Sequence, residues 1–338
     1  MPDSFDFSIQ HGVRKIARYI VLFLFVLGGV FLIVSDYSLS SKSRDDFSIY
    51  LLDYNVENLS DTPQNKLIKL GRKLIDSTSI YLGETSTDFH VGNVLNCTNC
   101  HLDSGTKAFG IPLIGVTKRF PQYRGREDKI GTIEDRINGC FERSMNGRKL
   151  DVNSLEMQAF VAYIDWLSRY IFPNERVAGK GLKSIVIPNR AVNLQRGKQV
   201  YENNCALCHG IDGFGVKRDN LTYEYPPLWG PNSYNNGAGM TRVLTAAQFI
   251  KYNMPLGVTY DSPLMTDDQA YDVAGYINQQ LRPMKDDLEI DFPNRLKKPV
   301  STPYPPYADP FPQSQHALGP FEPIIAFYKK NHQISKTK

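Results

Sequence analysis

The two stretches that decide the fold are Asn-Cys-Thr-Asn-Cys-His at 96–101 and Asn-Cys-Ala-Leu-Cys-His at 204–209. Both contain Cys-x-x-Cys-His, in which two thiols add to the vinyl groups of a haem and the adjacent histidine faces the iron. A zinc site would need two further ligands in each half, and a redox dithiol would not need the histidine. The sequence therefore predicts two covalently bound c-type haems, haem 1 and haem 2. The residues expected to hold them are Cys97, Cys100, His101, Cys205, Cys208 and His209.

A helical pattern repeats around the two motifs. In each half, apolar residues at helical spacing precede the motif and a further helix closes the half. We expect these helices over 66–81, 155–171, 191–203 and 267–281. The closing helices share similar words, Ala-Tyr-Ile-Asp at 162–165 and Gly-Tyr-Ile-Asn at 275–278, which indicates a duplication. Each half resembles a class I cytochrome c domain, so we expect an all-α chain with two such domains in tandem.

Both closing helices are preceded by a capping pattern. Asn153 with Glu156, and Thr266 with Gln269, have the spacing of a reciprocal N-terminal cap.

The proline-rich end of the chain holds eight prolines between 299 and 323. Its many aromatic residues predict that it packs on the body, because disordered segments carry few of them. The expected divisions are an N-terminal anchor over 1–38, domain 1 over 39–175, a linker over 176–190, domain 2 over 191–285 and the tail over 286–338.

The N-terminus carries an export signal. Arg14, Lys15 and Arg18 precede an apolar run over 20–34. As a helix this run rises about 22 Å, short of a roughly 30 Å hydrocarbon core, but Arg18 can snorkel to the interface. We expect an uncleaved transmembrane helix that holds the protein on the periplasmic side of the bacterial inner membrane. The alternative is a cleaved signal peptide, which leaves a soluble periplasmic protein.

The bulk composition is that of an ordinary globular protein, with 41% hydrophobic and 22% charged residues. A net charge of +4 favours neither a nucleic acid nor a strongly acidic partner. The five cysteines fit a disulfide framework poorly, because four lie in the two motifs and Cys140 has no thiol to pair with.

The second axial ligand of each iron bears on function. For haem 2 the candidates are Met240, Met254 and Met265. We expect Met254, because Pro255 and Gly257 fix the loop that would present its sulfur. A His209/Met254 iron would have a raised potential and would suit electron transfer.

For haem 1 the candidates are Cys140, Met145, Met157 and the remaining histidines, including His90. Met145 would be the habitual choice, and a lone cysteine is commonly a small buried hydrophobe. Cys140 nevertheless lies in an unusual run, Arg-Ile-Asn-Gly-Cys-Phe-Glu-Arg-Ser-Met-Asn-Gly, at 136–147.

That run resembles the active-site motif of the periplasmic thiosulfate dehydrogenases, di-haem enzymes that also act as tetrathionate reductases. The resemblance extends from about residue 70 to 328 and includes Asn-Met-Pro-Leu-Gly at 253–257, Tyr-Pro-Pro-Tyr at 304–307 and Gly-Pro-Phe at 319–321. It implies that Cys140 is the distal ligand of haem 1 and part of the catalytic site. It also implies that the matching residues Arg126, Arg136 and Ser144 hold substrate.

The chemistry of these residues agrees with that role. Thiosulfate and tetrathionate are dianions, and a guanidinium group gives forked hydrogen bonds to oxyanions. If 136–144 is helical, Arg136, Cys140 and Ser144 fall on one face. The alternative for Arg126 is pairing with a haem propionate or a solvated position.

The resemblance implies oxidation of two thiosulfate to tetrathionate, with electrons passing from haem 1 to haem 2. An external partner, either a small cytochrome c or a membrane redox protein, would accept or donate them. The main rival function is that of a membrane-anchored electron-transfer cytochrome without its own substrate. A di-haem peroxidase and a haem subunit of a larger thiosulfate-oxidising complex are two further candidates.

Overall fold

The computed structural model describes residues 20–24, 43–44, 47–84, 86, 89–173, 175–219 and 222–337. Contacts divide the chain into two units, Met1–Ser43 and Arg44–Lys338. Of the expected N-terminal helix, only Ile20–Leu24 is described, as a helical segment whose apolar side chains are more than half exposed; its other residues lie outside the described ranges. Among the helices described, none has the length and apolar character needed to cross a membrane.

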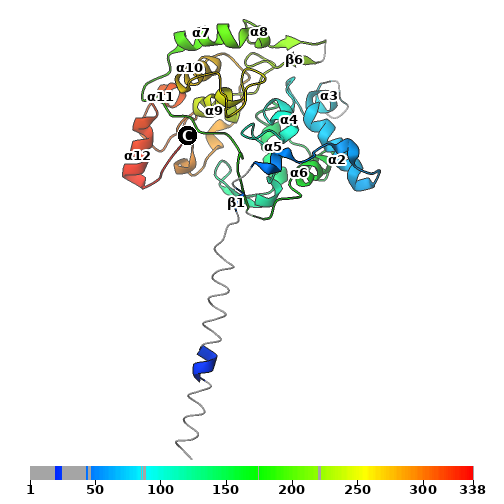
Figure 1. The fold of residues 1–338 in the computed structure, drawn as a ribbon. Helices are drawn as coiled ribbons and strands as arrows, with labels where there is room; N and C mark the ends of the chain where they lie inside the picture. The colour runs from blue at the N-terminus through cyan, green and yellow to red at the C-terminus, as the bar shows by residue number, and fades with distance from the viewer. Residues whose placement is uncertain are drawn as a thin grey trace, which may run out of the picture. The chain divides into compact units, whose positions relative to one another are not determined.

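The larger unit is mostly helical (Figure 1), with domain 1 on one side and domain 2 on the other. Domain 1 contains α2 (Pro63–Asp76), α3 (Thr78–Leu82), α4 (Leu102–Gly105), α5 (Ile133–Phe141) and α6 (Leu155–Leu167). Domain 2 contains α7 (Leu194–Asn204), α8 (Ala206–His209), α9 (Val243–Asn253) and α10 (Asp267–Asn278). The tail adds α11 (Gln313–Leu318) and α12 (Glu322–His332).

Short elements connect these helices. The 3-10 helices are η1 (Ser48–Leu51), η2 (Val56–Asn58), η3 (Cys97–Asn99), η4 (Thr117–Arg119), η5 (Gly239–Thr241), η6 (Leu288–Ile290) and η7 (Arg295–Lys297). The strands are β1 (Ser43–Arg44), β2 (Gln122–Arg124), β3 (Lys129–Gly131), β4 (Arg176–Val177), β5 (Val216–Lys217) and β6 (Tyr223–Tyr225). β2 pairs antiparallel with β3, and β5 with β6. The expectation of a purely α-helical chain therefore missed these small hairpins, which lie in the loop-rich segments after each motif.

Each domain contains the same kind of helix crossing, in which the helix before the haem motif packs closely against the closing helix. The structure therefore shows the same duplication as the sequence. A Cβ added at Gly71 of α2 would lie 2.1 Å from the Ala159 carbonyl oxygen of α6. A Cβ added at Gly197 of α7 would lie 2.2 Å from the Asp272 carbonyl oxygen of α10. Only glycine permits backbones to approach this closely. In both crossings a tyrosine Cβ is also close, that of Tyr163 and Tyr276 respectively, the same two tyrosines that the shared words align.

The caps of the closing helices are one correct prediction and one error. Thr266 and Gln269 form the expected capping box at α10. At α6 the cap is Ser154, whose hydroxyl accepts from the Met157 amide. Asn153 does not cap, because the helix begins one residue later than a cap at that position requires, and its backbone amide bonds instead to the Asp151 carboxylate.

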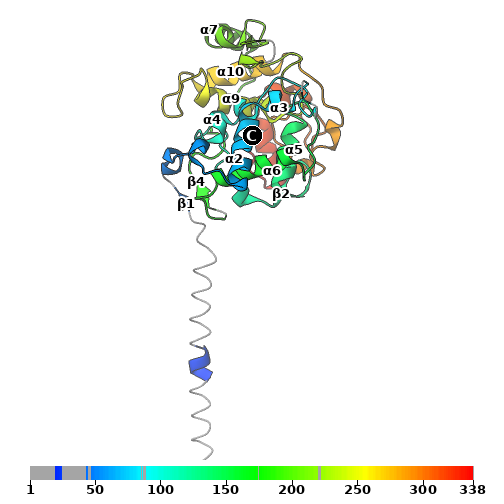
Figure 2. The same ribbon diagram turned by 90° about the vertical axis from the view of Figure 1, so that its right-hand side faces the viewer.

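A loop of domain 2 packs directly on domain 1. Tyr234 and Ala238 belong to the domain 1 core. The Asn93 amide of domain 1 donates to the carbonyls of Ser144 and Ser233, and the Asn235 amide donates to the Glu142 carbonyl. The segment that follows α5 is thus fixed by residues of both domains. In Figure 2, where the right-hand side of Figure 1 faces the viewer, α5 and α6 lie next to α2.

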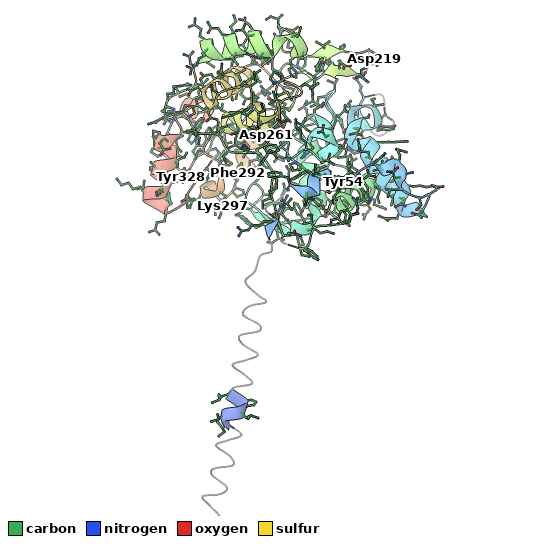
Figure 3. All side chains as sticks on the ribbon, in the orientation of Figure 1. Tyr54, Asp219, Asp261, Phe292, Lys297 and Tyr328 are labelled. Atoms are coloured by element: carbon green, nitrogen blue, oxygen red, sulfur yellow. The ribbon has the colours of Figure 1, made fainter. Side chains whose placement is uncertain are left out.

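The linker and the tail both lie against the body. The Phe109 amide donates to the Gly179 carbonyl over 2.7 Å, and Ile111 donates to Gly181, so the expected linker is held by domain 1. In the tail, Phe321, Ile324 and Tyr328 are buried in the domain 2 core. Figure 3 labels three tail side chains, Phe292, Lys297 and Tyr328, on the part of the body that carries α12.

Candidate functional site

Helix α5 presents Arg136 and Cys140 one turn apart. A capping box of Thr132 and Asp135 starts the helix. The guanidinium of Arg136 donates to the Cys140 sulfur over 2.8 Å. The helix ends at Phe141, so the expected helical alignment of Ser144 with these two residues is wrong. Ser144 nevertheless lines the same two cavities as Arg136 and Cys140, because the chain turns back after α5.

Both motif histidines are oriented in the same way. The Nδ1 of His101 bonds to the Ile111 carbonyl over 2.7 Å, and the Nδ1 of His209 bonds to the Pro226 carbonyl over 2.8 Å. A carbonyl accepts only from a protonated nitrogen, so Nε2 is left as the lone-pair atom that can bind a metal. This arrangement is typical of metal-bound imidazoles.

A mostly apolar cavity of about 420 Å³ adjoins the first motif. Its lining includes both motif cysteines, His101 and Cys140, and its walls are apolar side chains of domain 1, among them Leu95, Leu113, Phe160 and Ile164. Two thiols for attachment, an imidazole with Nε2 free and a facing sulfur are what a c-type haem requires. The residues present therefore fit a haem, with Cys97 and Cys100 attaching it and His101 and Cys140 as its candidate axial ligands.

The environment of Cys140 favours a thiolate. Burial opposes ionisation, but the Arg136 guanidinium beside the sulfur is the largest of the opposing influences, and the pKa of the Cys140 thiol is lowered to about 6. The thiolate is the form in which cysteine binds metals. The expected role of Cys140 as a distal ligand is thus chemically reasonable at neutral pH.

A second, polar cavity of about 470 Å³ shares His101, Arg136, Cys140 and Ser144 with the first. The arginines along its walls are Arg124, Arg126, Arg136, Arg143 and Arg242. Three carboxylates pair with three of them: Glu127 with Arg124, Glu142 with Arg143, and Asp291 with both Arg126 and Arg143. Positive charge therefore exceeds negative charge around this cavity, which suits an anion.

Arg126 lies in the cavity wall, as expected of a substrate residue, but it is already engaged. Its Nη1 donates to Asp291, to the Tyr304 hydroxyl and to the Gly237 carbonyl. Its side chain is 16% exposed, which excludes a solvated position. Arg126 thus joins domain 1 to the tail as well as contributing charge to the cavity.

The three methionines that are candidate ligands of haem 2 lie in different environments. Met240 packs against the domain 1 core and lines the polar cavity. Met265 is buried, 4% exposed, within the domain 2 core. Met254 directly follows α9 and packs at the edge of that core, where Cys205 also packs. The assignment of Met254 as a ligand stays a prediction.

Sequence reasoning missed four contributors to the polar cavity and its wall. Arg242 and Thr245 line the cavity, whereas Asp291 and Tyr304 hold Arg126 in its wall. All four follow the second haem motif, and most of the cavity belongs to domain 1. No local pattern marks them, because their proximity to Cys140 depends on how domain 2 and the tail pack.

Family models match both halves of the chain. Residues 92–171 match a model described as SoxA/TsdA, cytochrome c domain, and residues 194–280 match one described as cytochrome c. The chain therefore contains two cytochrome c domains and binds two c-type haems.

Curated relatives are similar over both domains. A thiosulfate dehydrogenase of Allochromatium vinosum is 41% identical over 230 residues, 67% of this chain and 82% of the relative. One of Stutzerimonas stutzeri is 40% identical over 226 residues, 66% and 71% of the two chains. For one of Psychrobacter arcticus, 42% identical, the match spans 61% of this chain and 62% of the relative.

A solved structure has the same fold. The thiosulfate dehydrogenase TsdBA of Marichromatium purpuratum superposes with a TM-score of 0.63 and 37% sequence identity. The match covers 68% of this chain and 49% of that one, so this chain corresponds to about half of the solved protein.

Proposed function

Because this chain belongs to the thiosulfate dehydrogenase family of c-type cytochromes, we propose that it oxidises two thiosulfate ions to one tetrathionate and catalyses the reverse reduction. One observation carries the proposal: Cys140 lies where the mostly apolar cavity beside the first haem motif meets a polar cavity lined by arginines. The sulfur is therefore within reach of both the expected cofactor and an anionic substrate.

The polar cavity suits a dianion. An anion that enters loses much of its hydration, and fixed cationic donors must replace it. Arg136 is the expected principal donor, since it contacts the Cys140 sulfur and belongs to none of the carboxylate pairs found in the described part of the chain. Ser144 adds a hydroxyl to the same wall.

The reaction joins the outer sulfurs of two thiosulfate ions by a new S–S bond and releases two electrons, with no proton gained or lost. When bound at the two motifs, the haems would supply one-electron chemistry, and the expected electron path from haem 1 to haem 2 would end at an external acceptor. The chain's own residues bind both anions, orient them near Cys140 and screen their mutual repulsion. The partner we expect is a small cytochrome c or a membrane redox protein.

We place the protein on the periplasmic side of the inner membrane, held by an N-terminal helix within 1–38. The support is sequence alone: basic residues Arg14, Lys15 and Arg18 before an apolar run. The alternative is a soluble periplasmic protein. Fractionation of cells that express the full chain decides between them, since an anchored protein sediments with the membranes and is released by detergent but not by salt.

An electron-transfer cytochrome without its own substrate is the second candidate. It would need no arginine-lined cavity beside its haem. A steady-state assay separates the two, with thiosulfate plus ferricyanide in one direction and tetrathionate plus a reduced dye in the other. We expect turnover in both directions, and no turnover in either direction would leave only the electron carrier.

A further inference from the structure

Arg242 stands at the start of α9, where domain 2 meets the polar cavity. Its Nε donates to the Gly239 carbonyl over 3.2 Å, which holds the guanidinium in place. Within the described residues, no ion pair includes Arg242, although it is mostly enclosed. Burial first, and then the neighbouring cations Arg126 and Arg136, lower its pKa to about 10. It is therefore a charged group at neutral pH whose charge no neighbouring carboxylate directly matches.

Thr245 lies one turn further along α9 and lines the same cavity. The residue is only 8% exposed. Its hydroxyl oxygen has no hydrogen-bond partner among the described residues. A buried polar atom without a partner costs free energy, and here it borders a cavity that can hold a polar ligand. Arg242 and Thr245 thus independently indicate a ligand at the same end of α9.

The substrate pair requires more than one anionic subsite. Tetrathionate carries a sulfonate group at each end, and two thiosulfate ions must be held together before they join. Like charges repel, so each sulfonate group needs its own cationic donor. Arg136 supplies one donor from domain 1. The other arginine in the run around Cys140 is not free for this task, since Arg143 pairs with Asp291.

We propose that Arg242 and Thr245 bind one of the two sulfonate groups, opposite the group held by Arg136, so that domain 2 completes the substrate site of domain 1. The inference rests on the proposed function for the identity of the anion. It assigns domain 2 a part in substrate binding beyond electron transfer. The N-terminus of α9 carries a partial positive charge, which also favours an anion in this subsite.

The test is equilibrium binding of tetrathionate to the fully oxidised, haem-loaded full chain. Tetrathionate and the enzyme are then both oxidised, so no turnover disturbs the titration. Loss of a charge-assisted hydrogen bond predicts that Arg242→Gln raises the dissociation constant about 10- to 150-fold, and loss of a neutral bond predicts about 2- to 12-fold for Thr245→Val. Arg242→Lys should recover part of the affinity, because lysine keeps the charge without the fork.

Arg218→Gln is the matched control. Arg218 is exposed and pairs with Glu224 on the surface of domain 2, so its loss should leave the affinity unchanged. In Arg242→Gln the spectra of both haems should also stay as in the wild type. If that variant fails to load haem, Arg242→Lys and Thr245→Val decide the question.

The outcomes separate the inference from the proposed function. Wild-type turnover together with unchanged tetrathionate affinity in the Arg242 and Thr245 variants overturns the inference alone. Tetrathionate binding without turnover in the wild type overturns the proposed function, and the variants still decide the subsite. A wild type that shows neither binding nor turnover overturns both.

Discussion

Cys140 borders both the apolar and the polar cavity, a position from which we expect a single sulfur to bind the iron and to contact substrate. Its role is predictable from sequence because it is the one cysteine outside the two motifs and lies in an unusual run. The structure adds the neighbouring Arg136 guanidinium, the largest of the influences that lower the pKa of Cys140 to about 6. Chemistry at this residue follows from local contacts on α5, which is why a sequence motif captures it.

Replacement of Cys140 by methionine tests the ligand assignment. A thioether is neutral and cannot act as a thiolate, so Cys140→Met should shift the spectrum of haem 1 toward His/Met ligation and abolish thiosulfate turnover. Electron paramagnetic resonance of the wild type should show a low-spin signal with thiolate character. A wild-type signal without thiolate character would contradict the assignment of Cys140 as a ligand of the haem 1 iron.

Arg136 should act on substrate and leave the haem unaffected. Removal of a charge-assisted bond costs about 1.5–3 kcal/mol, or roughly 10- to 150-fold in kcat/KM. We expect Arg136→Ala to lose thiosulfate activity by that factor with both haems attached, and Arg136→Lys to recover only part of it. Steady-state kinetics and absorption spectra measure both effects. A near-normal rate in Arg136→Ala, or a failure to load haem, would contradict the substrate role.

Met254 is the expected ligand of haem 2, and its two rivals serve as controls. The weak near-infrared band of methionine bound to ferric iron should vanish in Met254→Leu. It should persist in Met240→Leu, since Met240 lines the polar cavity, and in Met265→Leu, since Met265 is a buried core residue. Persistence of the band in Met254→Leu would show that a different methionine binds the iron.

At the scale of elements, the sequence predicts the helices around the two haem motifs. It does not predict the ion pairs that hold the domains and the tail together. The Thr266 cap is correct because capping is a local property, and the duplication inferred from the repeated words agrees with the crossings at Gly71 and Gly197, where their tyrosines lie. The position of Asp291 could not be predicted, because its partners Arg126 and Arg143 precede it by more than 140 residues. Long-range ion pairs depend on how the chain packs, and no repeating pattern in the sequence marks the residues that form them.

Asp291 should be the residue whose loss most weakens the connection between domain 1 and the tail. It pairs with Arg126 and Arg143 and accepts from the Tyr304 hydroxyl, with its side chain 4% exposed. Removing one partner of a buried ion pair costs about 3–5 kcal/mol. We expect Asp291→Asn to lower the free energy of unfolding by about that amount, measured by denaturant titration. Asp61→Asn, at an exposed pair with Lys66, should change it by less than about 0.5 kcal/mol.

The same ion pairs give Asp291 a pH signature. Burial opposes ionisation of Asp291, but Arg126 and Arg143 prevail and hold its pKa below the ordinary 3.8. A carboxyl with a lowered pKa stabilises the fold above its unfolded value, and that contribution is lost as the pH falls through the folded value. Part of the acid destabilisation below about pH 4 should therefore be absent in Asp291→Asn. An unchanged acid limb in that variant would contradict the ion-pair account.

At the scale of the whole molecule, the tandem of two haem domains is predictable because each motif fixes a covalent attachment and the helices around it repeat. The substrate cavity is predictable only in its domain 1 half. Arg242 and Thr245 line it from α9, and the tail supplies Phe292 to the lining and Asp291 as the partner of Arg143. Such a site forms only when both domains and the tail are packed together, so composition and spacing could not show it.

The most direct test of the central claim is the stoichiometry of thiosulfate oxidation by the purified, haem-loaded full chain. Thiosulfate consumed, ferricyanide reduced and tetrathionate formed are measured in the same sample. Oxidation at a single site that joins two thiosulfate ions predicts one tetrathionate formed and two ferricyanide ions reduced for every two thiosulfate consumed. Sulfite or sulfate as the product, or ferricyanide reduction without tetrathionate, would contradict the claim.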